Sequence, residues 1–127
     1  MITGRLAAPS GDAPFSDGVI VEGRLAFLAG QGPIHNGTIV RGPIREQAEA
    51  TLQNLAGCLA RLGADKSAVV TCTCYLADLG DVGAFNAAYL EFFGAHRPAR
   101  TTVQAQLIGG IGVEITAVVA LPPGEGG

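Results

Sequence analysis

Hydrophobic residues in the segment 44–62 recur every three or four positions, with charged residues between them. This spacing predicts an amphipathic helix with one apolar stripe. Pro43 suits the first turn of that helix, and Gly63 suits its end. The same period predicts a second helix over about 79–94. The expected stripes are Ile44, Ala48, Leu52, Leu55, Leu59 and Leu62 in the first helix, and Leu79, Val82, Phe85, Tyr89 and Phe92 in the second.

The remaining apolar segments have the composition of β-strands. Residues 18–31 predict a hairpin with Glu22-Gly23 as its turn, and Asn36-Gly37 predicts a further turn. β-Branched and apolar residues favour strands in the other segments. These strands are expected over 2–6, 68–78, 99–107 and 112–121.

The resulting order, β-β-α-β-α-β-β after a short first strand, predicts an α/β (α+β) domain. Its single mixed sheet would carry both helices on one face. A chain of 127 residues fits one domain, with a frayed tail from about 122 to 127. The opposite face of the sheet would be apolar with no helix left to cover it. We therefore expect another subunit to cover that face.

The composition supports the expectation of an oligomer. Apolar residues make up 48% of the chain and the mean hydropathy is +0.36, which is high for a monomer. Exposed apolar patches usually mark interfaces, so the excess is interpreted as surface buried between subunits. The alternative is a monomer with a compact core of alanine and valine.

Charge and hydropathy exclude several kinds of partner. The net charge is −3, Lys66 is the only lysine, and the seven arginines are scattered, so the clustered cations that bind nucleic acid are missing. No apolar run approaches the ~20 residues of a membrane span. The N-terminus has no signal-peptide pattern. We expect a cytoplasmic protein without nucleic-acid or membrane partners.

Three cysteines, Cys58, Cys72 and Cys74, form no recognisable metal or disulfide pattern. Cys72 and Cys74 lie two apart on one predicted strand, where side chains are poorly placed to bond each other. The two histidines make no ligand-spaced cluster with them. Buried free thiols and no metal are expected.

Arg100 lies at the beginning of an apolar strand in a chain with only 15% charged residues. Alternation places Arg100, Thr102 and Gln104 on one face of that strand. A guanidinium suits bidentate binding of a carboxylate. The alternative is an arginine at the rim that pairs with a surface acid.

Glu114 interrupts the last apolar strand, where a carboxylate must be paired, hydrogen-bonded or raised in pKa. The latter two states suit a general acid or base. The alternative is a structural ion pair, for which Arg100 is a candidate partner. The Gly-rich segment 29–33 could offer backbone N–H groups to an anionic oxygen, although a turn at the end of a strand also needs glycine.

Four segments occur in the order typical of the Rid family, the YjgF-like reactive-intermediate deaminases also called L-PSP endoribonuclease-like proteins. They are APFSDGVIVEGRLAFLAGQGPI, QAEATLQNLAGCLARLGA, VTCTCYLADLGDVGAFNAAYLEFFGAHRPARTTVQAQL and VEITAVVAL. The chain resembles this family over nearly its whole length. The resemblance implies a chorismate-mutase-like fold, a homotrimer and a ligand cleft between adjacent subunits.

The resemblance also implies roles for individual residues. Arg100 corresponds to the arginine that clamps a carboxylate, and Glu114 to the glutamate that handles the catalytic water. Gly30 would line the cleft, Thr102 would contact ligand, and Asn86 would lie near the site. The implied substrates are 2-enamines and 2-imines derived from amino acids, as for 2-iminobutanoate/2-iminopropanoate deaminases. Hydrolysis would give 2-keto acids and ammonia without a metal or organic cofactor.

Two departures from the family pattern bear on activity. Deaminating members usually carry a tyrosine where this chain has Phe15, in PFSD, so a hydroxyl is missing from the expected binding site. The loop before Glu114, IGGIG, is rich in glycine where many relatives carry proline and charged residues. The alternative function is therefore a non-catalytic trimer that binds small carboxylates such as 2-keto acids.

Overall fold

A computed structural model describes residues 1–124 of the chain, so the last three residues of the predicted frayed tail lie outside the described part. Short 3₁₀ turns cover Lys66–Ala68, Leu79–Asp81 and Ile108–Gly110. The strands and helices follow in the order β1 (Ile2–Leu6), β2 (Gly18–Val21), β3 (Leu25–Phe27), β4 (Ile34–His35), β5 (Thr38–Ile39), α1 (Ile44–Arg61), β6 (Val69–Leu76), α2 (Val82–Phe93), β7 (Ala99–Gln104) and β8 (Val113–Ala120).

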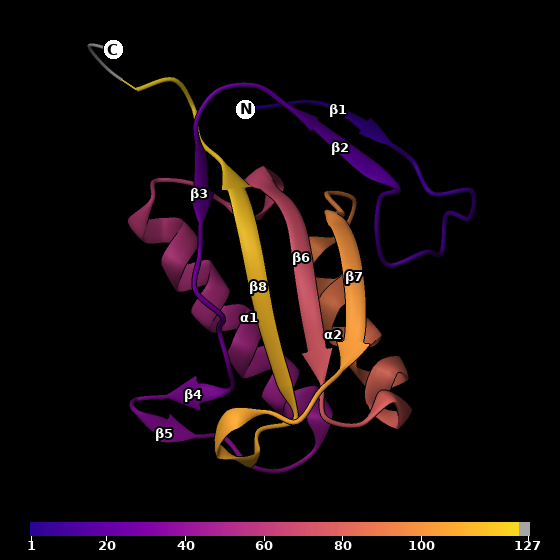
Figure 1. Cartoon of the computed structure of the whole chain (residues 1–127), viewed down its shortest axis with the longest axis vertical. Helices are drawn as coiled ribbons and strands as arrows, with labels where there is room; N and C mark the ends of the chain where they lie inside the picture. Colours follow the sequence, from indigo (N-terminus) through magenta and orange to yellow (C-terminus); the bar gives the residue numbers. More distant parts are fainter. Residues whose placement is uncertain (125–127) are drawn as a thin grey trace.

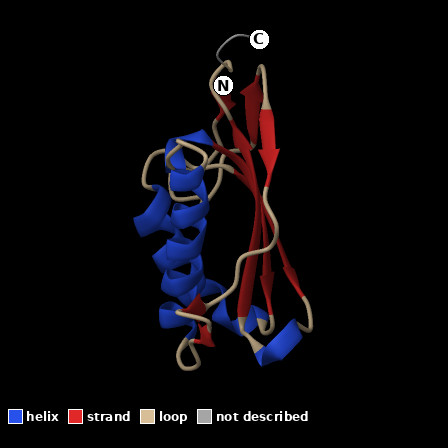
Figure 2. Cartoon of the chain, turned by 90° about the vertical axis from the view of Figure 1, so that its left-hand side faces the viewer, coloured by secondary structure: helices blue, strands red, loops and turns tan. Residues whose placement is uncertain are grey.

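The main sheet has four strands in the order β3-β8-β6-β7 (Figure 1). Strands β6 and β7 are parallel, whereas β8 is antiparallel to both β6 and β3. Helices α1 and α2 lie together on one face of this sheet (Figure 2). The predicted mixed sheet with both helices on one face is confirmed, but it is not the single sheet expected, because β1–β2 and β4–β5 form separate two-stranded sheets.

The core lies between the sheet and the two helices. Alternate residues of β6 and β8 point into it, as the period of two along a strand requires. The helices contribute the apolar stripes that face these strands. The core residues include Ala48, Leu52, Leu55, Leu59, Cys72, Cys74, Leu76, Phe85, Tyr89, Phe93, Val113, Ile115, Ala117 and Val119.

Glycines end the first helix and form the predicted tight turn. Gly63 has φ +68°, its N–H donates to the Ala60 carbonyl, and the Ala64 N–H donates to the Leu59 carbonyl. These two bonds cap the last carbonyl groups of α1. The predicted Asn36-Gly37 turn joins β4 to β5, and both of its residues have positive φ, as a two-residue hairpin turn requires.

The predicted hairpin over 18–31 is wrong. Strand β2 pairs with β1, and β3 pairs with β8 at the edge of the main sheet. Gly23 has φ +93°, so the chain does turn there, but its two flanking strands join different sheets. The alternation of apolar residues shows that a strand is present without showing which strand it pairs with.

The predicted stripe of the second helix is also partly wrong. Residues 79–81 form a 3₁₀ turn, in which the Asp78 carboxylate accepts from the Gly80 N–H, and α2 begins only at Val82. Leu79 is 46% exposed, Val82 is 37% exposed, and Phe93 is buried. The tighter turn changes the rotation per residue, which moves the first two positions away from the core.

In the described part of the chain, no helix covers the second face of the main sheet (Figure 2). The register places Leu25, Phe27 and Val118 on this open face, together with Tyr75 and several threonines of β6 and β7. Phe27 is 76% exposed. The open face is thus a mixture of threonine and large apolar residues, and its covering by another subunit stays a prediction.

Candidate functional site

Arg100 lies on β7, the edge strand of the sheet, and points toward α2. It pairs in register with the buried Cys72 of β6, so both side chains are on the face that carries the helices. Its Nε donates to Thr102 Oγ1 at 2.7 Å, and its Nη2 donates to Asn86 Oδ1 at 2.6 Å. The structure therefore brings together three of the residues expected at a ligand site.

The Arg100 guanidinium has no acidic partner among residues 1–124. Both ion pairs in this part of the chain belong to Arg45, which bonds Glu49 and Glu91. Arg100 Nη1 is buried and has no hydrogen-bond partner. The alternative of a rim arginine paired with a surface acid is therefore not what the structure shows. A partly buried cation without a counter-ion is suited to bind an anion.

Glu114 and Gly30 form a second group, on the open face of the sheet. Gln31 and Ile115 exchange backbone hydrogen bonds of 2.8 and 2.9 Å, which aligns the segment around Gly30 with β8. A Cβ atom on Gly30 would lie 2.8 Å from Glu114 Oε2 and 2.9 Å from its carboxyl carbon. The half-buried Glu114 side chain thus occupies the space that a side chain at position 30 would need.

The two groups lie on opposite faces of one sheet. Arg100 pairs with Cys72, whereas Glu114 pairs with Tyr75, an odd number of residues away on the same strand. Successive side chains of a strand alternate between faces, so Glu114 points away from the helices and from Arg100. An ion pair between Glu114 and Arg100 within one chain is therefore excluded.

Phe15 lies in the connection between β1 and β2. It lines a hollow of about 230 Å³ with Arg5, Ser10 and Arg97. The next residue, Ser16, donates its N–H to the Pro98 carbonyl at 3.0 Å and forms a bridge with Ala99. The Phe15 segment is thus attached to the start of β7, immediately before Arg100.

Arg97 is a structural residue that the sequence did not single out. Its Nη1 donates to the Gly11 and Ala13 carbonyls, and its own carbonyl accepts from Arg5 Nη1 and Ser16 Oγ. These bonds hold the connection that carries Phe15. Arg97 and Arg100 are three residues apart in HRPAR. The sequence around them does not show which of the two arginines donates to backbone carbonyls.

The three cysteines are free, as predicted, but only Cys72 and Cys74 are buried as expected, whereas Cys58 is half-buried. Cys72 and Cys74 lie on β6 beside Arg100 and Thr102 of β7. The described residues contain no group of side chains that could hold a metal ion. Burial raises the pKa of the Cys72 thiol to about 11, although the Arg100 charge opposes this shift. It raises the pKa of Cys74 further. Both groups are therefore neutral thiols near neutral pH.

Stability is expected to fall as pH rises from about 9 to 11. Unfolding exposes Cys72 to water, where its pKa returns to 9.0, so ionisation favours the unfolded chain until the folded pKa of about 11 is passed. The two-unit shift corresponds to roughly 2–3 kcal/mol. Urea unfolding at several pH values measures it. Cys72→Ala should reduce the slope by about half, because the buried Cys74 thiol contributes to the same fall in stability, whereas Cys58→Ala, at a half-buried thiol, should reduce it less. Equal slopes for both variants would rule out the buried thiol as the cause.

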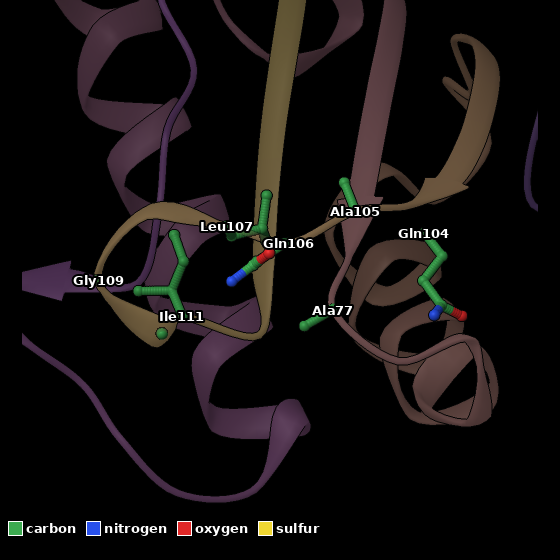
Figure 3. Close-up of a pocket in the computed structure, with 8 residues that line it drawn as sticks. Ala77, Gln104, Ala105, Gln106, Leu107, Gly109 and Ile111 are labelled. Atoms are coloured by element: carbon green, nitrogen blue, oxygen red, sulfur yellow. The ribbon is translucent and has the colours of Figure 1, made fainter.

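An open hollow of about 720 Å³ lies where β6 and β7 end and the β7–β8 connection begins (Figure 3). It carries no ionisable side chain and none of the expected site residues. Gln104, at its border, accepts a hydrogen bond from the Leu79 N–H through its side-chain oxygen Oε1. The lining residues are Ala77, Gln104, Ala105, Gln106, Leu107, Gly109, Gly110 and Ile111. This hollow offers no group for acid–base chemistry. Among the helices within residues 1–124, none combines the length and the apolar character needed to cross a bilayer.

Known proteins resemble this chain in both sequence and fold. The family model described as Endoribonuclease L-PSP matches residues 5–121. The chain is 45% identical to Protein DfrA of Myxococcus xanthus over 73 residues, which span 57% of this chain and about half, 56%, of that relative. It is 35% identical to the 2-iminobutanoate/2-iminopropanoate deaminase of Capra hircus over 124 residues, covering 96% of this chain and 90% of the goat protein.

Solved structures of the same family have a similar fold. A solved structure of a Rid-family protein from Yersinia pestis superposes with a TM-score of 0.78 and 30% identity, covering 89% of this chain and 91% of that one. The family match over residues 5–121 includes Arg100 and Glu114, and the structural match covers 89% of the chain. This chain belongs to the Rid family, the YjgF-like group whose model is described as Endoribonuclease L-PSP.

Proposed function

We propose that this protein hydrolyses 2-enamines and 2-imines derived from amino acids to 2-keto acids and ammonia. The observation that carries the proposal is the Arg100 guanidinium, which is held by Asn86 and Thr102 and has no acid partner in the described chain. Such a group supports binding of the carboxylate that these substrates share. Relatives named 2-iminobutanoate/2-iminopropanoate deaminases support the same class of reaction.

The reaction places modest demands on the protein. The imine carbon is already electrophilic, so water adds to it while a proton goes to the nitrogen. The carbinolamine then loses ammonia, as its hydroxyl proton is transferred and the C–N bond breaks, leaving the keto group. An enamine first takes a proton on carbon and loses one from nitrogen to become the imine. Holding the carboxylate and moving protons suffice, and Glu114 is the carboxyl group proposed to move them.

Arg100 and Glu114 would act together only across a contact between two copies of the chain. They lie on opposite faces of one sheet, so a cleft that contains both needs Arg100 from one protomer and Glu114 with Gly30 from its neighbour. The exposed Phe27 and Val103 on the open face support such a contact. We propose the homotrimer expected of the family. Light scattering should give about three times 12.9 kDa, whereas a species of 12.9 kDa at micromolar concentration would contradict the shared cleft.

The function is tested by generating an amino-acid-derived imine, such as 2-aminoacrylate, in the presence of the protein. Its remaining concentration is followed by trapping with semicarbazide. Faster loss than in the protein-free reaction is expected. If several imines decay at the uncatalysed rate while 2-ketobutyrate raises the melting temperature, the protein is a carboxylate-binding member of the family instead.

Replacing Gly30 by alanine is expected to displace the Glu114 carboxylate, because the new methyl group would lie within 3 Å of it. Misplacement of a reacting group by about 1 Å can cost roughly 100-fold in rate, so a 10- to 100-fold lower kcat is expected. The imine assay measures this effect.

Gly57→Ala is the matched control. Gly57 lies within α1, and a Cβ there meets nothing within 4 Å. It should stabilise the protein by about 0.5–1 kcal/mol without a change in rate. A Gly30→Ala variant with the wild-type kcat would show that the position of Glu114 does not matter.

A further inference from the structure

Two aromatic rings of α2 support the Arg100 guanidinium. Phe85 and Tyr89 lie one turn apart, both fully buried, with ring centroids 5.6 Å apart and planes tilted by 42°. The guanidinium carbon of Arg100 is 4.9 Å from the Phe85 centroid and 4.7 Å from the Tyr89 centroid. The cation therefore lies against both rings at once, within the range at which an aromatic face attracts it.

The rings and the hydrogen bonds restrict different motions of the guanidinium. Asn86 and Thr102 accept hydrogen bonds from Nη2 and Nε, which fix the direction of the side chain. The rings limit tilting and replace part of the hydration that a buried cation loses. Because no acid among residues 1–124 bonds Arg100, these neutral contacts alone hold the charge in place.

We propose that Phe85 and Tyr89 are positioning residues that hold Arg100 in a fixed orientation for the carboxylate of its ligand. The proposal deepens the proposed function and rests on it for the identity of that ligand. Because preorganisation of the cation lowers the entropy lost on binding, we expect loss of the rings to change mainly ligand affinity and KM.

The ring of Tyr89, and not its hydroxyl, is the part that acts. Tyr89 Oη is buried close to the Cys72 thiol but makes no hydrogen bond of ordinary geometry, and burial raises the pKa of the phenol well above its ordinary value, so the group stays neutral. Removing this hydroxyl while keeping the ring costs little, because a thiol is at most a weak hydrogen-bond partner. Tyr89→Phe is therefore the conservative variant, and Tyr89→Leu removes the aromatic face.

Phe93 provides a control for the loss of a core ring. It is fully buried on the same helix and packs against Tyr89 with ring centroids 4.6 Å apart. The cation–π contacts of Arg100 involve Phe85 and Tyr89. Phe93→Leu thus removes an aromatic ring of the same cluster without removing either of those contacts.

The experiment compares wild type, Tyr89→Leu, Tyr89→Phe and Phe93→Leu by calorimetric titration with 2-ketobutyrate and by KM and kcat for an imine. Tyr89→Leu should raise Kd and KM about 5- to 30-fold, equivalent to about 1–2 kcal/mol, with a smaller change in kcat. Tyr89→Phe should remain within about twofold of wild type. Phe93→Leu should lower the melting temperature comparably to Tyr89→Leu while Kd changes less than twofold.

A second measurement separates this inference from the proposed function. Phenylglyoxal modifies exposed guanidinium groups, and mass spectrometry of the peptide that contains Arg100 gives its rate of modification. Tyr89→Leu should accelerate that rate at least threefold, and Phe93→Leu should not. If wild type neither hydrolyses imines nor binds 2-ketobutyrate, the proposed function fails, while the modification rates still decide the role of the rings. Equal modification rates of Arg100 in Tyr89→Leu and Phe93→Leu, or equal Kd values where 2-ketobutyrate binds, would overturn the proposed role of the rings.

Discussion

Arg100→Ala is expected to lower kcat/KM for imine hydrolysis by about 100- to 1000-fold. Truncating one partner of a hydrogen-bonded charge pair typically costs about 2–5 kcal/mol, and each 1.4 kcal/mol is a factor of ten. The described chain has no second cation in this position, because the other nearby arginine, Arg97, donates to backbone carbonyls. The same variant should abolish the rise in melting temperature caused by 2-ketobutyrate.

Arg100→Lys is expected to recover only part of the loss. An ammonium keeps the charge but cannot donate to Thr102 and Asn86 in the planar arrangement seen here. Arg45→Ala is the matched control, since it removes an arginine of α1 whose ion pairs, with Glu49 of α1 and Glu91 of α2, are exposed. Surface pairs contribute little, so activity should stay within about twofold of wild type. An Arg100→Ala variant that still hydrolyses imines at the wild-type rate would remove the basis of the proposed site.

Glu114→Gln is expected to lower kcat by about 10²- to 10⁴-fold with little change in KM. The amide keeps the shape that packs against Gly30 but cannot exchange a proton, and general acid–base help is worth that much. The melting temperature should change little, because no ion pair of Glu114 is present within residues 1–124. Steady-state kinetics of imine loss measure both constants.

Glu91→Gln provides the comparison for Glu114. Glu91 is an exposed carboxylate on α2 that pairs with Arg45, so its neutralisation should leave kcat unaffected. A mixture of Arg100→Ala and Glu114→Gln chains offers a further check. Mixed trimers would contain some clefts with both native residues and should regain part of the activity. Failure of the mixture to exceed either variant alone, after exchange of subunits has been verified, would argue against a shared cleft.

The local elements could be predicted from the sequence because each depends on residues close in the chain. The steps of three and four between apolar residues from Ile44 onward define α1. Gly63 ends it because glycine readily adopts the left-handed conformation that turns the chain away from a helix. The pairing of Leu25–Phe27 could not be predicted in this way, since it depends on β8, more than ninety residues later. The rotation of Leu79 out of the core depended on a 3₁₀ turn that the spacing of apolar residues does not encode.

Parts of the site followed from local spacing as well. Alternation places Arg100 and Thr102 on one face of a strand, and the structure has them hydrogen-bonded. Resemblance to the family indicated Asn86, and the structure places it against Arg100 from a different element. Phe85 and Tyr89 were expected only as core residues, because their apolar period is the same whether or not a cation lies on them.

The sequence by itself determined the two helices, the presence of most strands, the fold class and the family, because hydrophobic period, turn residues and motif order can be read along the chain. The tertiary structure decided which strands pair, that Arg100 has no acid within its reach, and that Glu114 points to the other face of the sheet. Those facts depend on which distant segments meet and on the register of β6 with β7 and β8. A shift of that register by one residue would move either charge to the opposite face, and no pattern within a single strand records it.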